Sequence, residues 1–153
     1  WGETTKKSEY YDSNSLTHDI KISRLQKRGI IDSNGNLTSS YDVATANWGG
    51  TWRMPTKSEL KELVNKCTWT LTKQNNVIGY KVTGPNGNSI FLPAAGYRGG
   101  SSLYRAGEYG RYRSSTPYES NSVDACSLYF DSGSQYVSWY NRCGGQSVRP
   151  VSE

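Results

Sequence analysis

Apolar residues recur at helical spacing most clearly between residues 56 and 67. Four positions make one apolar stripe: Leu60, Leu63, Val64 and Cys67. Thr56 and Glu59 stand at the spacing of a capping box, in which each side chain accepts a hydrogen bond from the other residue's backbone N–H. We therefore predict a helix over roughly 56–67, with its apolar stripe in the core.

The pattern after residue 67 changes from helical spacing to the alternation typical of strands. We predict strands over 68–72, 78–83, 88–92, 125–131, 135–141 and 147–151. Ser40 is expected to cap a short helix over 41–47 that Gly49 ends. The first forty residues are weakly patterned, and 96–122 is expected to be a long irregular region. Because helices come early and strands late, the fold class is α+β.

The alternation in the two late strands separates two faces. One face is expected to be core and carries Leu128, Phe130, Val137 and Trp139. The other face carries Ser127, Tyr129, Asp131, Tyr136, Ser138 and Tyr140. If the two strands share a sheet, these second faces form one continuous patch. A plain solvated sheet face is the alternative, but that face would also use Lys, Thr and Glu.

Composition supports a binding surface. Of 153 residues, 12 are Tyr, and eight of these lie in 97–144 among Ser, Gly, Arg and Asp. Tyr and Arg provide most of the affinity in many protein interfaces, while Ser and Gly fit between them. The abundance of aromatics argues against disorder. No apolar run approaches the roughly 20 residues of a membrane span, so we expect no membrane insertion.

The charge is unevenly distributed along the chain. The net charge is +5, and all nine Lys lie before residue 82. The segment 96–151 has six Arg against four acidic residues, a net charge of only +2. Because a nucleic-acid surface is usually more basic, we expect no nucleic-acid partner.

Candidate catalytic and metal-binding chemistry is sparse. Cys67, Cys126 and Cys143 lack metal-binding or disulfide-framework spacing. Either Cys126 and Cys143 form one bridge or all three are free thiols, and the spacing favours free thiols. His18, the one histidine, lies in a polar segment and is expected to be solvated. We therefore predict no catalytic residue, no metal and no cofactor. The chain opens at Trp1 without Met, as expected of an excised or processed piece.

Three segments together form a specific pattern: 48–56 (WGGTWRMPT), 87–98 (GNSIFLPAAGYR) and 146–151 (QSVRPV). They resemble the Fibrobacter succinogenes major-domain family of gut Bacteroidetes and their phages. Many members are variable proteins of diversity-generating retroelements. The resemblance implies a C-type-lectin-type fold of the branch similar to formylglycine-generating enzyme. It implies a single domain over 1–153, with a scaffold in 1–96 and a variable ligand-binding region in 97–151.

In such retroelements a reverse transcriptase misreads template adenines, which turns AAC codons into NNC codons. Positions that this mechanism can reach, and at which family members differ, are implied to form the ligand-binding face. They are Tyr104, Arg105, Arg111, Tyr118, Val123, Asp124, Cys126, Ser127, Tyr129, Asp131, Tyr136, Ser138, Tyr140, Asn141, Cys143 and Gly144. Relatives usually carry Trp at the position of Arg113, and adenine misreading does not explain the arginine.

Three functions follow as hypotheses. The first is a non-enzymatic protein that binds a protein or glycan ligand on a cell or phage surface, located on a virion tail fibre or a bacterial cell surface. As a fibre tip, it would form a homo-oligomer. The second is an enzyme, by fold analogy with formylglycine generation, but no residue pattern supports the chemistry. The third is a bacterial surface adhesin or lipoprotein domain that is not diversified. Calcium-dependent sugar binding is not expected, because acidic residues do not cluster.

Overall fold

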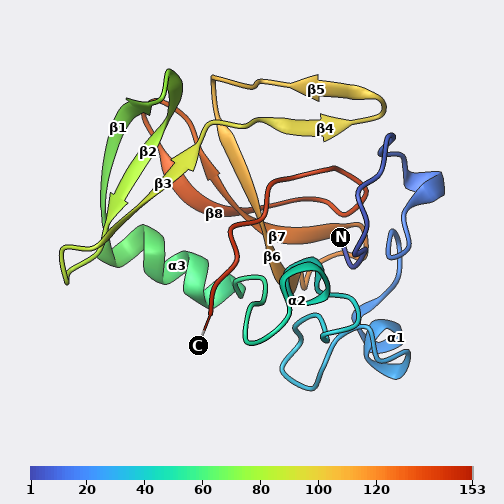
Figure 1. The fold of residues 1–153 in the computed structure, drawn as a ribbon. Coiled ribbons are helices and arrows are strands. Elements are labelled where there is room, and N and C mark those ends of the chain that lie inside the picture. Colours follow the sequence, from blue (N-terminus) through green and yellow to red (C-terminus); the bar gives the residue numbers. More distant parts are fainter. Residues whose placement is uncertain (153) are drawn as a thin grey trace.

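A computed structural model describes residues 1–152 and confirms an α+β fold with short helices and small antiparallel sheets (Figure 1). The helices are η1 (Asp12–Asn14), α1 (Ile22–Lys27), α2 (Val43–Trp48) and α3 (Lys57–Lys66). The strands are β1 (Thr68–Gln74), β2 (Val77–Thr83), β3 (Ser89–Pro93), β4 (Tyr97–Gly99), β5 (Ser102–Tyr104), β6 (Gly110–Pro117), β7 (Asp124–Phe130) and β8 (Gln135–Asn141). Within these residues no helix has the length and apolar character that a bilayer crossing requires.

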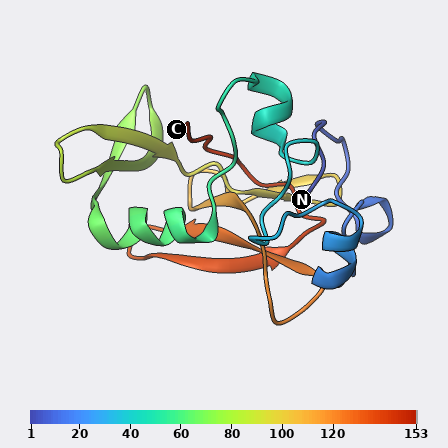
Figure 2. The same ribbon diagram turned by 90° about the horizontal axis from the view of Figure 1, so that it is seen from below.

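The strands form three separate antiparallel groups, ordered β1-β2-β3, β4-β5 and β6-β7-β8. In Figure 1 the β4–β5 hairpin lies at the top, while α3 and α2 lie toward the bottom. Helix α3 packs against all three strands of the β6–β8 sheet, and Figure 2 shows it lying along that sheet. One face of the β6–β8 sheet is therefore occupied by α3, and the hairpin lies on the other side.

Two buried clusters hold these parts together. The cluster between α3 and the sheets contains Leu60, Tyr80, Val82, Leu92, Ala94, Tyr112, Leu128 and Phe130. The second cluster contains Trp1, Leu25, Ile30, Ile31, Leu37, Ala44, Met54 and Ala125. The weakly patterned first forty residues therefore supply most of a core, which the sequence pattern did not reveal. A side chain at Gly110 would collide with the Phe130 ring, so this glycine lets the aromatic ring pack against β6.

The helix predicted over roughly 56–67 is confirmed as α3, together with its capping box. The Thr56 hydroxyl accepts from the Glu59 N–H at 3.2 Å, and the Glu59 carboxylate accepts from the Thr56 N–H at 2.8 Å. Arg53 adds two donors to the same carboxylate, at 2.8 and 2.7 Å. These hydrogen bonds, led by the one from Arg53, lower the pKa of Glu59 to about 2.

Because the pKa of Glu59 is lowered, we expect part of the free energy of unfolding to be lost in acid. In the unfolded chain the pKa of Glu59 returns to about 4.3, so the unfolded state binds more protons below that pH. The stabilisation is complete above about pH 4.3 and is lost as the pH falls toward 2. We expect Glu59→Gln to lower the unfolding free energy at pH 7 by about 1 kcal/mol and to flatten this pH dependence. Urea unfolding measured at several pH values tests this prediction.

Glu62→Gln is the matched control for that experiment. Glu62 pairs with Lys66 on the exposed side of the same helix, where an ion pair contributes little. A Glu59→Gln variant that is as stable as Glu62→Gln at pH 7, and that loses as much stability between about pH 4.3 and 2, would contradict the role given to the Arg53–Glu59 contact.

Several local predictions were wrong. The helix near residue 43 is capped by Asp42, whose side chain accepts from the N–H groups of Ala44 and Thr45, and not by Ser40. The segment 96–122 is not irregular, because it contains β4, β5 and β6. The predicted strand 147–151 makes only isolated bridges, through Ser147 and Val151.

Trp139 is a further correction, because its side chain is 50% exposed rather than in the core. It lies on the same side of β8 as Val137, as alternation requires, and Val137 does pack against the core. The Trp139 ring instead stacks on Tyr118, with centroids 4.5 Å apart. Alternation fixes the side of a sheet on which a residue lies, but not whether another element covers it.

Candidate ligand-binding surface

The register of β6, β7 and β8 brings predicted binding residues together on the sheet face opposite α3. Tyr129 lies directly opposite Arg111 on β6 and Tyr136 on β8. Directly opposed residues point to the same face of a sheet, and Tyr140 joins them because it follows Tyr136 by four residues. The predicted continuous patch across the two late strands is therefore present.

The β4–β5 hairpin adds further tyrosines to this patch. Tyr97 and Tyr104 are cross-strand partners whose rings stack with centroids 5.4 Å apart. The Tyr97 ring meets the Tyr140 ring edge-on at 5.1 Å, which joins the hairpin to β8. Gly96 lets the backbone at the end of β5 approach the start of β4, because it has φ of +66° and a side chain there would strike the Tyr104 carbonyl.

Tyr109 completes a continuous set of rings. It lies 6.1 Å from Tyr97 and 5.3 Å from Tyr129, and Tyr129 lies 5.0 Å from Tyr136, all between centroids. We call this set, together with the arginine at its centre, the tyrosine surface. Its members are Tyr97, Tyr104, Tyr109, Arg111, Tyr129, Tyr136 and Tyr140.

Arg111 lies against three of these rings. Its guanidinium carbon is 4.4 Å from the centroid of Tyr140, 5.0 Å from Tyr129 and 5.9 Å from Tyr97. The Nε and Nη1 atoms are covered and find no hydrogen-bond partner among residues 1–152. Such cation–π contacts satisfy the charge only in part, so Arg111 brings a positive charge without an acidic partner to the centre of the tyrosine surface.

The hydroxyls of Tyr129 and Tyr140 remain protonated at neutral pH. Burial, followed by the hydrogen bond to Asp131, raises the pKa of Tyr129 to about 12. Burial also raises the pKa of Tyr140 above its usual range. Tyr129 donates to the Asp131 carboxylate at 3.0 Å. Tyr129 and Tyr140 therefore place neutral hydroxyl groups beside the Arg111 guanidinium.

The tyrosine surface is accessible and lies next to a hollow. Tyr104 and Tyr136 are 45% and 48% exposed. A depression of about 650 Å³ adjoins Tyr109 and Tyr129 and extends to Asp131. A ligand can therefore contact the exposed rings and also enter the neighbouring depression.

Arg113 lies on the same face of β6 but is buried and has a different role. It donates to the carbonyls of Tyr140 at 2.9 Å, Asn141 at 2.8 Å and Gly144 at 3.0 Å. Burial lowers the pKa of Arg113 to about 9, so the side chain remains mostly charged at pH 7. An arginine at this position thus holds the backbone that follows β8.

The sixteen predicted binding residues do not form one surface. Five of them belong to the tyrosine surface: Tyr104, Arg111, Tyr129, Tyr136 and Tyr140. Asp131 lies at its edge through the hydrogen bond from Tyr129. Ser138 lies between Tyr136 and Tyr140 on β8 and is partly exposed. Arg105, next to Tyr104, is exposed and paired with Glu108 at 2.8 Å.

The remaining residues lie elsewhere. Cys126, Ser127 and Gly144 are buried, so in this conformation they present no surface to a ligand. Tyr118 stacks on Trp139, on the side of the sheet that faces α3. The other four lie where the β6–β7 connection and β7 meet the end of β8: Val123, Asp124, Asn141 and Cys143. There the Arg142 N–H donates to the Val123 carbonyl and its Nε donates to the Asp124 carbonyl.

Tyr97 and Tyr109 belong to the tyrosine surface but were not among the sixteen. Both lie in the tyrosine-rich segment 97–144, which is the signal that could have included them. Tyr97 also belongs to the 87–98 motif shared with the family that the chain resembles, whereas the sixteen positions were chosen as ones at which family members differ.

The prediction for the cysteines is confirmed, whereas the prediction for the histidine is not. All three cysteines are free, as the spacing favoured. The expectation of a solvated His18 was wrong, because its side chain is only 17% exposed and its Nδ1 lies 3.1 Å from Asn141 Oδ1. The sequence separation of 123 residues hides this contact from any local pattern.

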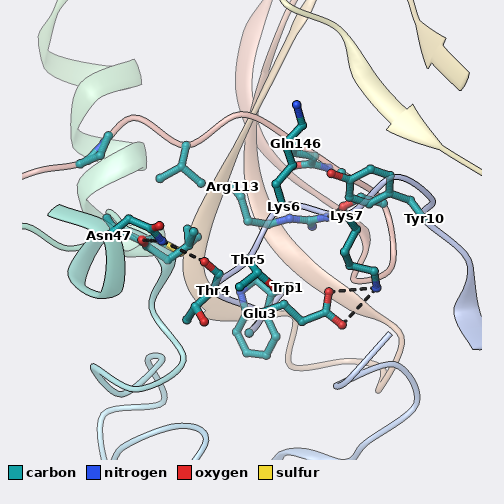
Figure 3. A pocket seen from close by; sticks show the side chains of 18 of the residues that line it. Trp1, Glu3, Thr4, Thr5, Lys6, Lys7, Tyr10, Asn47, Arg113 and Gln146 are labelled. Atoms are coloured by element: carbon teal, nitrogen blue, oxygen red, sulfur yellow. Dashed lines mark hydrogen bonds and ion pairs between the residues drawn. The ribbon is translucent and has the colours of Figure 1, made fainter. Parts of the chain in front are cut away.

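A second concave site lies near the N-terminus. This cleft of about 480 Å³ is lined by residues that include Thr4, Lys7, Asn47, Arg113 and Gln146 (Figure 3). Lys7 is paired with Glu3 at 3.0 Å, and the Asn47 amide donates to the Thr4 carbonyl at 2.9 Å. Arg113 is also engaged with carbonyl groups, so the side chains of Lys7, Asn47 and Arg113 are used internally. The buried Gln146 amide has no hydrogen-bond partner among residues 1–152. Because its charged groups are already paired or hydrogen-bonded, the cleft is the weaker candidate.

Comparisons with known proteins give one match. Residues 54–151 match a family model described as a domain of unknown function, DUF8237. This range includes the entire tyrosine surface. No curated protein matches the chain, and no solved structure matches it.

Proposed function

Since the chain belongs to the DUF8237 family, whose function is unknown, we propose that it is a non-enzymatic ligand-binding protein. The tyrosine surface is its binding site. The observation that carries this proposal is the set of six tyrosines around Arg111, whose Nε and Nη1 have no hydrogen-bond partner in the described chain.

The residue types of this surface suit recognition rather than catalysis. Tyrosine provides a large contact area with both apolar and hydrogen-bonding character, and it has few torsions to restrict on binding. Arginine and tyrosine are the residues that most often dominate binding energy. Because Arg111 lacks an acidic partner, we expect the ligand to carry a carboxylate or sulfate group on a glycan or protein.

The family resemblance extends the proposal. The Fibrobacter succinogenes major-domain resemblance supports a single C-type-lectin-like domain whose region 97–151 is diversified by a retroelement. Five of the sixteen positions implied to vary lie on the tyrosine surface, while Leu128 and Phe130 of the implied scaffold are buried. Such a protein would act on a virion tail fibre or a bacterial cell surface. The alternative is a surface adhesin that uses the same site without diversification.

An array of acidic and neutral oligosaccharides and acidic peptides tests the proposal. We expect the labelled chain to bind acidic members in preference to neutral ones. Tyr136→Ala should weaken that binding by about tenfold, because it removes an exposed ring from the surface. Trp48→Ala is the matched control, since Trp48 is a 60% exposed aromatic residue outside the tyrosine surface. Equal loss in both variants, or binding to neutral members alone, would contradict the proposal.

A further inference from the structure

Asp12, His18 and Cys143 form a cluster that no sequence motif indicates. One side-chain ligand atom from each residue lies within 4.8 Å of the other two. His18 Nε2 is 3.5 Å from Asp12 Oδ2. Asp12 and His18 come from the segment around η1, whereas Cys143 follows β8. The fold thus brings a carboxylate, an imidazole and a thiol to one point.

Asn141 fixes the orientation of the imidazole. Its Oδ1 accepts from the Cys143 backbone N–H at 3.1 Å and lies 3.1 Å from His18 Nδ1. Because this oxygen can only accept, Nδ1 of His18 must carry the hydrogen of that contact. In the neutral imidazole, the lone pair is then on Nε2, which faces Asp12. A second hydrogen bond that orients the ring in this way is typical of histidines that bind metals.

We propose that Asp12, His18 and Cys143 bind a divalent transition-metal ion, with Zn²⁺ as the best-fitting member. Sulfur, imidazole nitrogen and carboxylate oxygen are the ligands that zinc takes in proteins, usually in tetrahedral geometry. Three protein ligands leave the fourth position to water. On binding, the Cys143 sulfur forms the metal bond and its proton passes to the buffer.

A nucleophilic cysteine is the competing interpretation of the same cluster. A reactive thiol alone would give no thiolate-to-cobalt absorption, so the cobalt titration separates the two interpretations. A metal cation between the Cys143 thiol and the Asp12 carboxylate would compensate both groups.

The proposed site goes beyond ligand binding by the tyrosine surface. It would connect the η1 segment to the end of β8, directly after Tyr140. Residues 141 and 144 are also held by Arg113. We therefore expect the metal to stabilise the fold by binding only the native arrangement of the three ligands.

Cobalt titration of the reduced, chelator-treated chain tests the proposal. We expect one Co²⁺ per chain, with thiolate-to-cobalt charge-transfer absorption and the visible bands of tetrahedral cobalt. Zn²⁺ should displace the cobalt and raise the thermal unfolding midpoint. His18→Ala and Cys143→Ser should each lower the affinity for Co²⁺ by at least about tenfold.

Cys67→Ser is the matched control, because Cys67 is a partly buried free thiol outside the cluster. Circular dichroism verifies that each variant is folded before titration. The proposal is overturned if the wild-type chain gives no thiolate–cobalt absorption. It is also overturned if folded Cys143→Ser binds cobalt as tightly as Cys67→Ser.

Discussion

Replacing Arg113 by methionine is expected to lower the free energy of unfolding by about 2–4 kcal/mol. The side chain is buried and donates to the carbonyls of Tyr140, Asn141 and Gly144. Methionine fills part of the volume but supplies no donor, so the buried Gly144 carbonyl loses its hydrogen bond, while the Asn141 carbonyl keeps only the one from the Gly144 N–H. Each orphaned buried acceptor costs about 1–3 kcal/mol.

Urea unfolding at pH 7, followed by circular dichroism, measures this loss. Arg149→Met is the control, because Arg149 is exposed and its replacement should change stability by about 0.5 kcal/mol or less. Equal stabilities for the two variants would show that the backbone after β8 does not depend on Arg113.

In contrast to Arg113→Met, Arg111→Met is expected to cause a large loss of ligand affinity and little change in the free energy of unfolding. The covered Nε and Nη1 atoms have no hydrogen-bond partner within residues 1–152, so methionine orphans no acceptor. The lost cation–π contacts are expected to cost about 1 kcal/mol. An arginine at the centre of an interface typically contributes about 2–4 kcal/mol, which corresponds to an affinity loss of about 30- to 1,000-fold.

The affinity of Arg111→Met for an acidic ligand selected from the array measures this loss, with wild type and Trp48→Ala measured in parallel. The same urea experiment used for Arg113→Met provides the stability. A variant that binds as tightly as wild type would remove Arg111 from the site. A variant that unfolds like Arg113→Met would assign Arg111 a structural role.

Local sequence signals predicted the parts of the fold that local interactions determine. The capping box at Thr56 and Glu59 satisfies backbone groups within one helical turn, so its outcome depends little on distant residues. The alternation in 125–131 and 135–141 likewise predicted both strands and the face that carries Tyr129 and Tyr136. These signals were sufficient to predict a tyrosine-rich face on the late strands.

Long-range contacts explain what the sequence pattern missed. Arg142 donates to the carbonyls of Thr17 and Ile20, more than 120 residues away. The N-terminal segment is therefore ordered by partners that its own apolar pattern cannot indicate. The burial of His18 was missed for the same reason, because the neighbouring residues Asn141 and Cys143 come from the other end of the chain. The prediction that Trp139 is a core residue failed for a different reason. Its side of β8 was predicted correctly, but neither buried cluster in residues 1–152 includes it.

Diversification is proposed to act on the tyrosine surface. Deep amplicon sequencing of this gene from a growing source population tests that proposal and does not require an identified ligand. We expect substitutions concentrated at Tyr104, Tyr129, Tyr136 and Tyr140, with the buried Leu128 and Phe130 unchanged. A uniform sequence, or substitutions spread equally over buried and exposed positions, would contradict it.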